Sequence, residues 1–197
     1  MKFVIVGLGN PGAEYVDTRH NVGFMVLNRL AEHFDVTPES NRYGFTAKAR
    51  HRGKQLQLVM PTTFMNLSGK AVQYYLQQHK APIQNLMVVT DDLALPFGQC
   101  RMKPSGSDGG HNGLKDIQAT LGTGKYPRLK VGIGNEFPKG GQVDYVLSDF
   151  TDREFDALPQ ILDYCVDGIL KWVGHGIQQT MNSFNENRFI LPINFNK

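Results

Sequence analysis

The sequence of 197 residues contains only two cysteines, Cys100 and Cys165, and no CxxC motif. Without a secretory signal, such a pair favours reduced thiols in or near the core over a disulfide framework. No stretch approaches the ~20 consecutive apolar residues of a membrane-spanning helix. The apolar run within residues 1–7 is too short for a signal peptide. We therefore expect a cytoplasmic protein that makes no membrane contact.

Common signatures of metal centres and serine hydrolases are also missing. The six histidines show no HxxxH or HExxH spacing, which argues against a metal site. No G-x-S-x-G elbow is present, so a serine hydrolase of that type is not expected. We expect no bound metal.

Composition and charge are ordinary for a folded protein. Apolar residues make up 41% of the chain and charged residues 20%, which is typical of globular proteins. The length fits one domain, residues 1–197, with a sizeable core. The formal net charge of +3 permits an anionic partner without demonstrating one.

Apolar patterning predicts alternating strands and helices. Short apolar runs that end at glycine or aspartate indicate buried strands, whereas apolar positions three and four apart indicate helices. The expected strands are residues 2–6, 43–51, 55–60, 86–90, 99–103 and 129–133, and the expected helices are residues 21–34, 68–79, 112–121 and 154–173. Ser68 is expected to cap its helix, and Phe155 to face inward. Because residues 43–60 read as a hairpin, the α/β domain should contain a mixed sheet.

Four loops combine glycine with asparagine, and two of them add histidine. Loops often present binding groups on a rigid scaffold. Amide side chains contact polar substrates without adding charge, and histidine can transfer a proton near neutral pH. The combination indicates a hydrolytic site for a polar, polymeric substrate. The loops are residues 7–12 (GLGNPG), 18–24 (TRHNVGF), 61–69 (PTTFMNLSG) and 109–114 (GGHNGL).

The first loop also matches the GxGxxG pattern of dinucleotide-binding proteins. However, Pro11 removes a backbone N–H that a pyrophosphate would need. No helix follows at once, and no acidic residue clearly ends a second strand. A nicotinamide enzyme is therefore a weak alternative, and a tight turn with positive φ angles explains the glycines. It does not explain Asn10 at the tip of the loop.

Two histidines and two aspartates occupy positions where α/β proteins often carry their chemistry. His20 precedes a helix, where a capping role is commoner than catalysis. Asp91 and Asp92 end a buried strand, where a carboxylate can hold an imidazole in one tautomer. His111 precedes another helix, whose free N–H groups and dipole suit a phosphate. Balancing positive charge could come from Lys103, Lys115, Arg128 and Lys130.

Taken together, these segments closely resemble the bacterial peptidyl-tRNA hydrolase family. The matching strings occur in the same order as in the family, and the similarity extends through residues 131–134 and 145–147 to cover nearly the whole chain. The strings are residues 4–12 (VIVGLGNPG), 18–21 (TRHN), 61–69 (PTTFMNLSG), 91–96 (DDLALP) and 109–116 (GGHNGLKD).

The resemblance implies hydrolysis of the ester that links a peptide to the 3′ end of tRNA. It implies a single three-layer α/β/α globule with a mixed, mostly parallel central sheet, and no organic cofactor. By resemblance, His20 is the base that activates water and Asp91 orients it. We also expect a monomer whose partner is the 3′ end and acceptor stem of peptidyl-tRNA.

The resemblance further implies a set of residues that bind the substrate. Those expected to hold the peptide and the 3′ end are Asn10, Tyr15, Phe64, Asn66, His111 and Asn112. Lys103 and Lys130 are expected to contact tRNA phosphates. The family often has arginine where Lys130 stands, and lysine lacks the bidentate fork of arginine, so this contact should be looser.

The main alternative is a non-catalytic RNA-binding relative that kept the fold. Such a relative is expected to have lost the base or its partner, because fold alone does not fix function. His20 and Asp91 are both present, which favours the enzyme.

Overall fold

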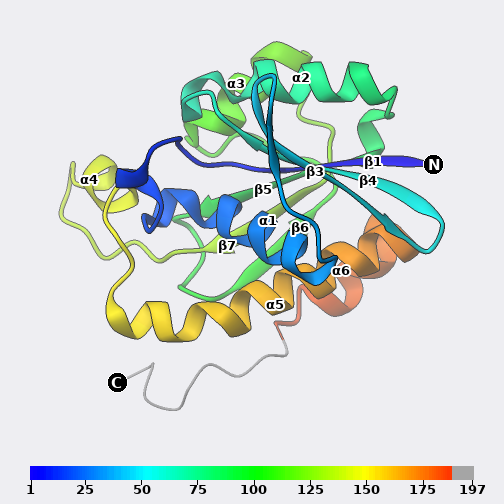
Figure 1. The fold of residues 1–197 in the computed structure, drawn as a ribbon. Helices are drawn as coiled ribbons and strands as arrows, with labels where there is room; N and C mark the ends of the chain where they lie inside the picture. Colours follow the sequence, from blue (N-terminus) through cyan, green and yellow to red (C-terminus); the bar gives the residue numbers. More distant parts are fainter. Residues whose placement is uncertain (188–197) are drawn as a thin grey trace.

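The computed structural model describes residues 1–187, and its centre is a seven-stranded sheet with helices on both faces (Figure 1). The strands are β1 (Lys2–Gly7), β2 (Glu39–Asn41), β3 (Gly44–His51), β4 (Lys54–Pro61), β5 (Leu86–Asp92), β6 (Cys100–Lys103) and β7 (Arg128–Gly132). The helices are α1 (Val22–His33), α2 (Ser68–His79), α3 (Asn112–Leu121), α4 (Gln142–Val146), α5 (Asp152–His175) and α6 (Ile177–Phe184). No helix in the described range is long and apolar enough to cross a membrane.

The sheet is mixed, with strand order β2-β3-β4-β1-β5-β7-β6. The four central strands pair in parallel, while β2, β3 and β6 add antiparallel pairings at the edges. The mixed sheet is confirmed, but three of the six described pairings are antiparallel, so "mostly parallel" holds only for the centre. The tight turn after β3 joins it directly to β4, and such a short connection permits only antiparallel neighbours.

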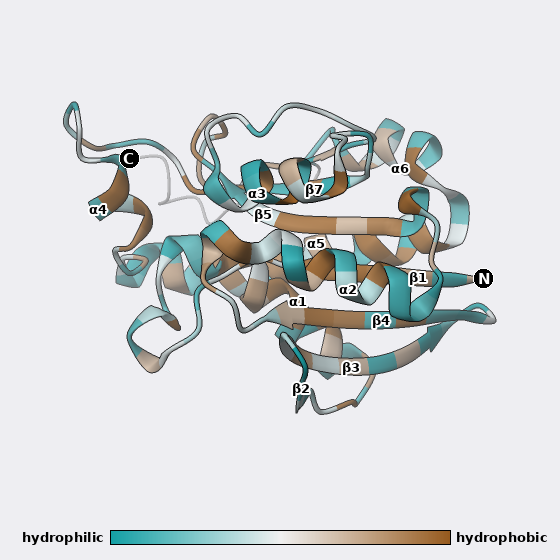
Figure 2. Ribbon diagram, turned by 90° about the horizontal axis from the view of Figure 1, so that it is seen from above, coloured by the Kyte–Doolittle hydropathy of each residue, from teal (hydrophilic) through white to brown (hydrophobic). Residues whose placement is uncertain are grey.

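Helices α2 and α3 cover one face of the sheet, and α1, α5 and α6 cover the other, as the three-layer prediction requires (Figure 1). Alternate residues of β1 enter the two cores: Phe3 and Ile5 pack with α1 and α5, whereas Val4 and Val6 pack with α2 and α3. The carboxyl-terminal half of β4 and most of β5 are apolar, as Figure 2 shows. Burial on both faces is the reason for these continuous apolar runs.

The two cysteines lie in the core, as the sequence predicts. Cys100 of β6 and Cys165 of α5 are both buried and free, with their Sγ atoms 3.6 Å apart. They join the sheet to the layer formed by α1, α5 and α6.

Two predictions about helix ends are wrong. Ser68 is the first residue of α2, not its cap, because its hydroxyl donates to the carbonyl of Met65 at 2.7 Å instead. Helix α5 starts two residues earlier than expected, with a capping box in which Thr151 and Glu154 bind each other's backbone N–H. Phe155 lies in the first turn of α5 and is 44% exposed, so it does not enter the core.

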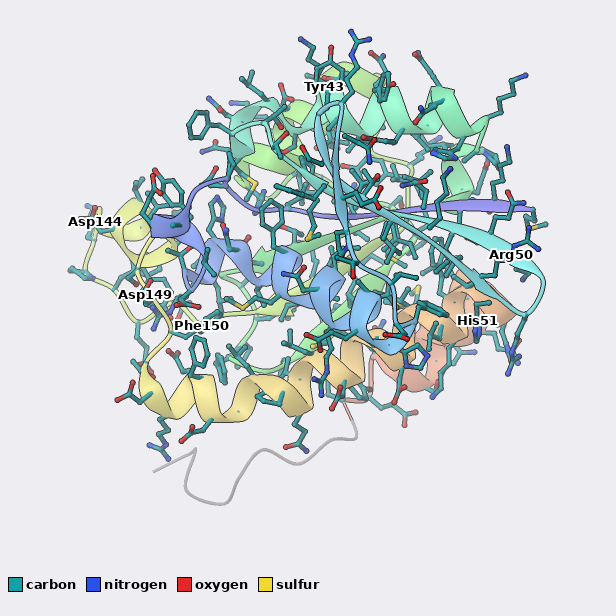
Figure 3. The ribbon with its side chains drawn as sticks, in the orientation of Figure 1. Tyr43, Arg50, His51, Asp144, Asp149 and Phe150 are labelled. Atoms are coloured by element: carbon teal, nitrogen blue, oxygen red, sulfur yellow. The ribbon has the colours of Figure 1, made fainter. Side chains whose placement is uncertain are left out.

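The carboxyl ends of the central strands meet at one edge of the sheet, where open α/β sheets usually carry their sites. Helix α4, marked by Asp144 in Figure 3, lies at this edge. Arg50 and His51, at the turn between β3 and β4, lie at the opposite edge. The fold therefore gathers the loops that follow the central strands β1, β4 and β5 into one place.

Candidate active site

A cavity of about 700 Å³ opens at the edge of the sheet near α4. Its walls come from the loop after β1, the loop after β4, the end of β5, the loop before α3 and α4 itself. Eight of the ten predicted site residues line it; they are Asn10, His20, Phe64, Asn66, Asp91, His111, Asn112 and Lys130. Tyr15 and Lys103 do not.

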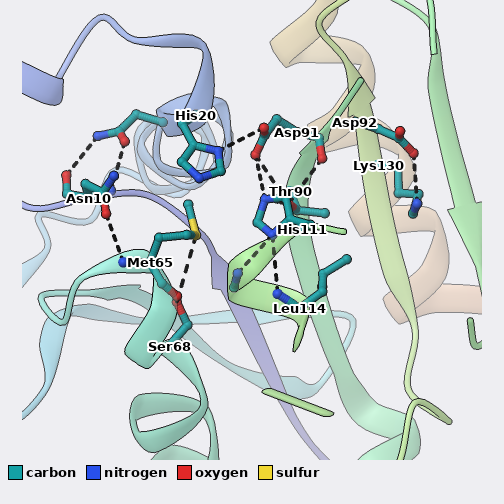
Figure 4. Close-up of polar contacts among 12 residues, drawn as sticks. Asn10, His20, Met65, Ser68, Thr90, Asp91, Asp92, His111, Leu114 and Lys130 are labelled. Carbon is teal, nitrogen blue, oxygen red and sulfur yellow. Dashed lines mark hydrogen bonds and ion pairs between the residues drawn. The ribbon is translucent and has the colours of Figure 1, made fainter. Parts of the chain in front are cut away.

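Asp91 lines this cavity and lies between two imidazoles (Figure 4). Its Oδ2 lies 2.9 Å from Nδ1 of His20, and its Oδ1 lies 2.8 Å from Nε2 of His111. The Asp91 side chain is only 2% exposed. Burial alone would raise the pKa of Asp91, but the two imidazoles outweigh it and hold the pKa well below its usual range. Asp91 is therefore a carboxylate that accepts hydrogen bonds from both rings.

The hydrogen bonds of His111 fix its tautomer. Its Nδ1 accepts from the backbone N–H groups of Gly113 and Leu114, at 3.1 and 3.3 Å. Nε2 must then carry the proton, and it lies 2.8 Å from Asp91 and 2.7 Å from the hydroxyl of Thr90. His111 thus caps α3. Two of the N–H groups that the sequence predicted to be free for a phosphate at this helix end therefore already bind the imidazole.

His20 uses only one of its two ring nitrogens. Nδ1 donates to Asp91, because a carboxylate oxygen can only accept. Nε2 has no hydrogen-bond partner among residues 1–187 and belongs to a side chain that lines the cavity. Burial lowers the pKa of His20, but the charge of Asp91 and the hydrogen bond to it raise the pKa above the ordinary value of 6.5. The ring is thus poised to accept a proton at Nε2.

Hydrogen bonds to both the backbone and the side chain of Asn10 fix its position in the site (Figure 4). Its backbone N–H and carbonyl bind the side-chain amide of Asn21 at 2.8 and 2.9 Å. Its Oδ1 accepts from the backbone N–H of Met65 at 2.8 Å. This contact assigns the amide orientation, so the NH2 group of Asn10 is a donor with no partner in the described part of the chain.

Known proteins match this chain along nearly its whole length. The peptidyl-tRNA hydrolase family model matches residues 4–190. Curated peptidyl-tRNA hydrolases from Parabacteroides distasonis and Cytophaga hutchinsonii are 52% and 49% identical, each over 94% of this chain and over 99% and 98% of their own. The chain belongs to the peptidyl-tRNA hydrolase family. The crystal structure of peptidyl-tRNA hydrolase from Acinetobacter baumannii has a TM-score of 0.87 at 31% identity, covering 93% of this chain and 94% of its own.

The other predicted substrate residues of this family member differ in exposure. Phe64, Asn66 and Asn112 are exposed on the cavity wall. Tyr15 is half-buried in a short 3-10 turn and does not line the cavity. A direct contact of Tyr15 with a substrate in this cavity is therefore not favoured by the structure.

The basic residues considered for phosphate contact fall into three situations. Lys130 lines the cavity, and its Nζ lies 2.8 Å from Oδ2 of Asp92. Lys103 is half-buried on the edge strand β6 outside the cavity, and Lys115 is exposed on α3. Arg128 is fully buried and donates to two backbone carbonyls at 2.8 and 3.0 Å. Arg128 therefore stabilises the fold and is not accessible to a phosphate.

The glycines of the first loop have packing roles. A Cβ on Gly7 would lie 2.2 Å from the carbonyl oxygen of Gly23, and one on Gly9 would lie 2.8 Å from the ring of Phe24. Only Gly12 of the three has a positive φ, +120°. The predicted turn with positive φ angles therefore explains Gly12 alone, and close approach of α1 explains the other two.

Arg19 is a structural anchor of this site that the sequence did not single out. Its guanidinium binds Glu154 and the Ser148 hydroxyl, each at 2.7 Å, and lies 4.6 Å from the ring centre of Tyr145. These contacts tie the turn that carries His20 to the segment between α4 and α5. Asn21, which binds both backbone groups of Asn10, was also missed. Both residues belong to the TRHN string, so their position beside His20 was the available signal.

Among residues 1–187, one cluster has ligand atoms close enough to surround a metal ion: His20, Asp91 and His111, with atoms within 4.8 Å of one another. The facing nitrogen and oxygen atoms lie 2.8 and 2.9 Å apart, which are hydrogen-bond distances. Nδ1 of His111 is also occupied by backbone N–H groups. The donor set is therefore arranged to fix protons, and the chemistry of the site can be derived without a metal.

Proposed function

We propose that this chain hydrolyses the ester between a peptide and the 3′ end of tRNA, with His20 as general base. The observation that carries the assignment is the 2.9 Å contact of His20 Nδ1 with Asp91, while Nε2 of this cavity-lining ring has no hydrogen-bond partner among residues 1–187. Family membership supplies the substrate class. We extend the proposal to a single domain over residues 1–197 that acts as a monomer in the cytoplasm.

The reaction needs a proton acceptor and later a proton donor at one position. Nε2 of His20 takes a proton from a water molecule while the water oxygen attacks the ester carbonyl. The resulting imidazolium is stabilised by Asp91 and then gives its proton to the departing 3′ oxygen of the tRNA. The products are a peptide with a free carboxylate and a tRNA with a free hydroxyl. A positioned general base of this kind contributes about 10²–10⁴-fold in rate.

The negative charge that develops on the carbonyl oxygen needs a donor in a fixed place. The NH2 group of Asn10 fits this role, because its oxygen is held by the N–H of Met65 and its backbone by Asn21. One preorganised donor of this kind contributes about 3 kcal/mol of transition-state stabilisation. Asn66 and Asn112 are exposed on the same wall and would bind the peptide backbone or the terminal nucleotide.

The tRNA would approach from the side of β7 and β6. Lys130 and Lys103 lie on these strands and would contact phosphates, which fix position without reading sequence. Lys130 is paired with Asp92 at 2.8 Å, so a phosphate must compete with that carboxylate. The contact at Lys130 would therefore be weaker than that of an unpaired lysine.

A release assay tests the proposal. The wild-type protein should release N-acetylaminoacyl groups from tRNA, and His20→Ala should release them at least ~10²-fold more slowly while keeping its melting temperature. His33→Ala, an exposed histidine at the end of α1, is the matched control and should behave as wild type. Free aminoacyl-tRNA tests whether the enzyme requires a blocked amino group. Undiminished release by folded His20→Ala would refute the assignment of the base, and no release by the wild type would favour an RNA-binding role.

A further inference from the structure

A second cavity, of about 470 Å³, adjoins the active-site cavity at Asn10, which lines both. Its walls are the loop of residues 10–17, one side of α1, the first turns of α5 and the start of β3. We call it the apolar groove. Its main apolar side chains are Val16, Phe24, Met25, Phe45, Phe155 and Leu158.

Exposed apolar side chains are concentrated at these two cavities. Eight large apolar residues are exposed within the described range. Three of them, Val16, Phe45 and Phe155, line the apolar groove with exposures of 57%, 45% and 44%. Three others line the active-site cavity: Phe64, Val143 and Leu147. Exposed apolar surface of this kind is typical of a binding site. Because Asn10 lines both cavities, we infer that the groove extends the active site.

The charged residues that line the two cavities indicate which part of the substrate each cavity can bind. The active-site cavity is lined by Lys130 together with Asp91, Asp92 and Asp108, so its lining includes a cation. Among residues 1–187, Asp17 is the only charged residue that lines the groove. Asp17 would repel a phosphate, and within the described part of the chain no cation lines the groove to offset that repulsion. The groove is therefore unsuited to nucleic acid and suited to a neutral, apolar chain.

Polar groups for a peptide backbone are also present in the groove. Asn28 of α1 is exposed on its wall and offers both donors and an acceptor. Pro159 lies inside α5 and has no N–H, so the carbonyl of Phe155 lacks its helical partner four residues on. A few polar groups within an apolar wall are the usual composition of a ligand site.

We propose that the apolar groove binds apolar side chains of the peptide part of the substrate. The peptide would pass over Asn10, from the ester beside His20 into the groove, while the tRNA occupies the Lys130 side. This inference rests on the proposed function for the identity of the substrate. It predicts that peptides with apolar residues behind the ester are released more efficiently than a single N-acetylated residue.

Three esters on the same tRNA test the groove: N-acetyl-leucyl, N-acetyl-Ser-Ser-Ser-Ser-Leu and N-acetyl-Leu-Ser-Leu-Ser-Leu. Phe155→Ser and Phe45→Ser should each lower kcat/KM for the leucine-containing pentapeptide by about threefold to tenfold, chiefly through KM, because apolar contact area is lost. Release of N-acetyl-leucine should not change. Phe155→Leu keeps an apolar side chain and is the matched control. Both phenylalanines are exposed, so the variants should melt like the wild type.

An equal loss on all three esters, or none on any, would overturn the groove as a peptide site. Failure of the proposed function is a different outcome, in which the wild type releases none of the esters. The groove then remains testable with the free peptide N-acetyl-Leu-Ser-Leu-Ser-Leu. Its binding should shift the side-chain amide NMR signal of Asn28 in the wild type and less in Phe155→Ser, and the absence of any shift in the wild type would refute the proposal.

Discussion

His20 and His111 bind the two oxygens of the same carboxylate, at 2.9 and 2.8 Å, and their side chains are 11% and 10% exposed. By distance and burial they are equivalent. They differ in the second ring nitrogen: in His20 it has no partner in the described part of the chain, and in His111 it accepts from two backbone N–H groups. The start of α3 uses one imidazole as a cap and leaves the other available. The base in this site is therefore identified by its unused nitrogen, not by its contact with Asp91.

The sharpest test of this difference compares alanine variants of the two histidines. Release of N-acetylaminoacyl-tRNA by His20→Ala should fall by at least ~10²-fold, since a general base gives that order of rate. His111→Ala should fall less, because its role is to position Asp91 and α3. Single-turnover rates with enzyme in excess measure both. A larger loss in His111→Ala would reverse the assignment.

Asp91→Asn should follow in size, with kcat reduced more than KM, because the carboxylate stabilises the imidazolium that forms in the transition state. We expect kcat to fall by at least about tenfold, which corresponds to the free energy of one hydrogen bond to a charged group. Asp92→Asn is the matched control on the same strand end. Its effect should be small, because Asp92 contacts Lys130 and not His20. Equal losses in the two variants would move the orienting role away from Asp91 alone.

The pH profile should reflect the same contact. His20 must be neutral to accept a proton, so the rate should rise with pH through a pKa above 6.5, raised by Asp91. In Asp91→Asn the raising interaction is removed while burial, which lowers the pKa, remains. The inflection should therefore move to lower pH. Profiles of kcat/KM in both proteins measure this, and an unmoved or higher inflection would contradict the role of Asp91.

The free energy of unfolding should fall more in His111→Ala than in His20→Ala, which is the reverse of the order expected for activity. His111→Ala removes the cap of α3 and should lower the free energy of unfolding by about 1 kcal/mol. His111→Asn restores a capping side chain and should recover part of the loss. His20→Ala removes no cap and should change stability less. Urea unfolding at pH 7.5 measures all three, and a smaller loss for His111→Ala than for His20→Ala would show that the cap is not the difference.

Lys130→Ala should have the smallest effect. Binding of tRNA should weaken modestly, and its salt dependence should decrease by about one unit of the log–log slope if one phosphate contact is lost. Lys115→Ala, an exposed lysine on α3, is the control. An unchanged slope for Lys130→Ala would show that Asp92 keeps this lysine from the phosphate.

Much of the site was predictable because it lies in short strings with local meaning. The loop at Asn10 and the aspartates at 91 and 92 each follow an apolar run that predicts a strand, and the TRHN string was assigned a role through the family resemblance. The order of central strands and helices followed from apolar periodicity, which depends on neighbours in sequence. The combination of glycine, asparagine and histidine in four loops also predicted a hydrolytic site from the sequence alone.

Other features depended on segments far apart in the chain. The sequence offered Arg128 as a phosphate ligand, but in the structure it is buried and donates to the carbonyls of Ser107 and Gly124. Phe155 fits an apolar helix face, but within residues 1–187 it stays 44% exposed in the first turn of α5 and lines a groove.

The sequence by itself determined the family, the alternation of strands and helices and the loops that carry the chemistry, because these depend on residues close together in the chain. Only the tertiary structure decided which nitrogen of each histidine is used, that Lys130 is paired and that a second cavity adjoins the first. Those properties depend on which atoms approach from distant segments. Hydrogen bonding and burial, which set proton positions and pKa values, are fixed only when those segments meet.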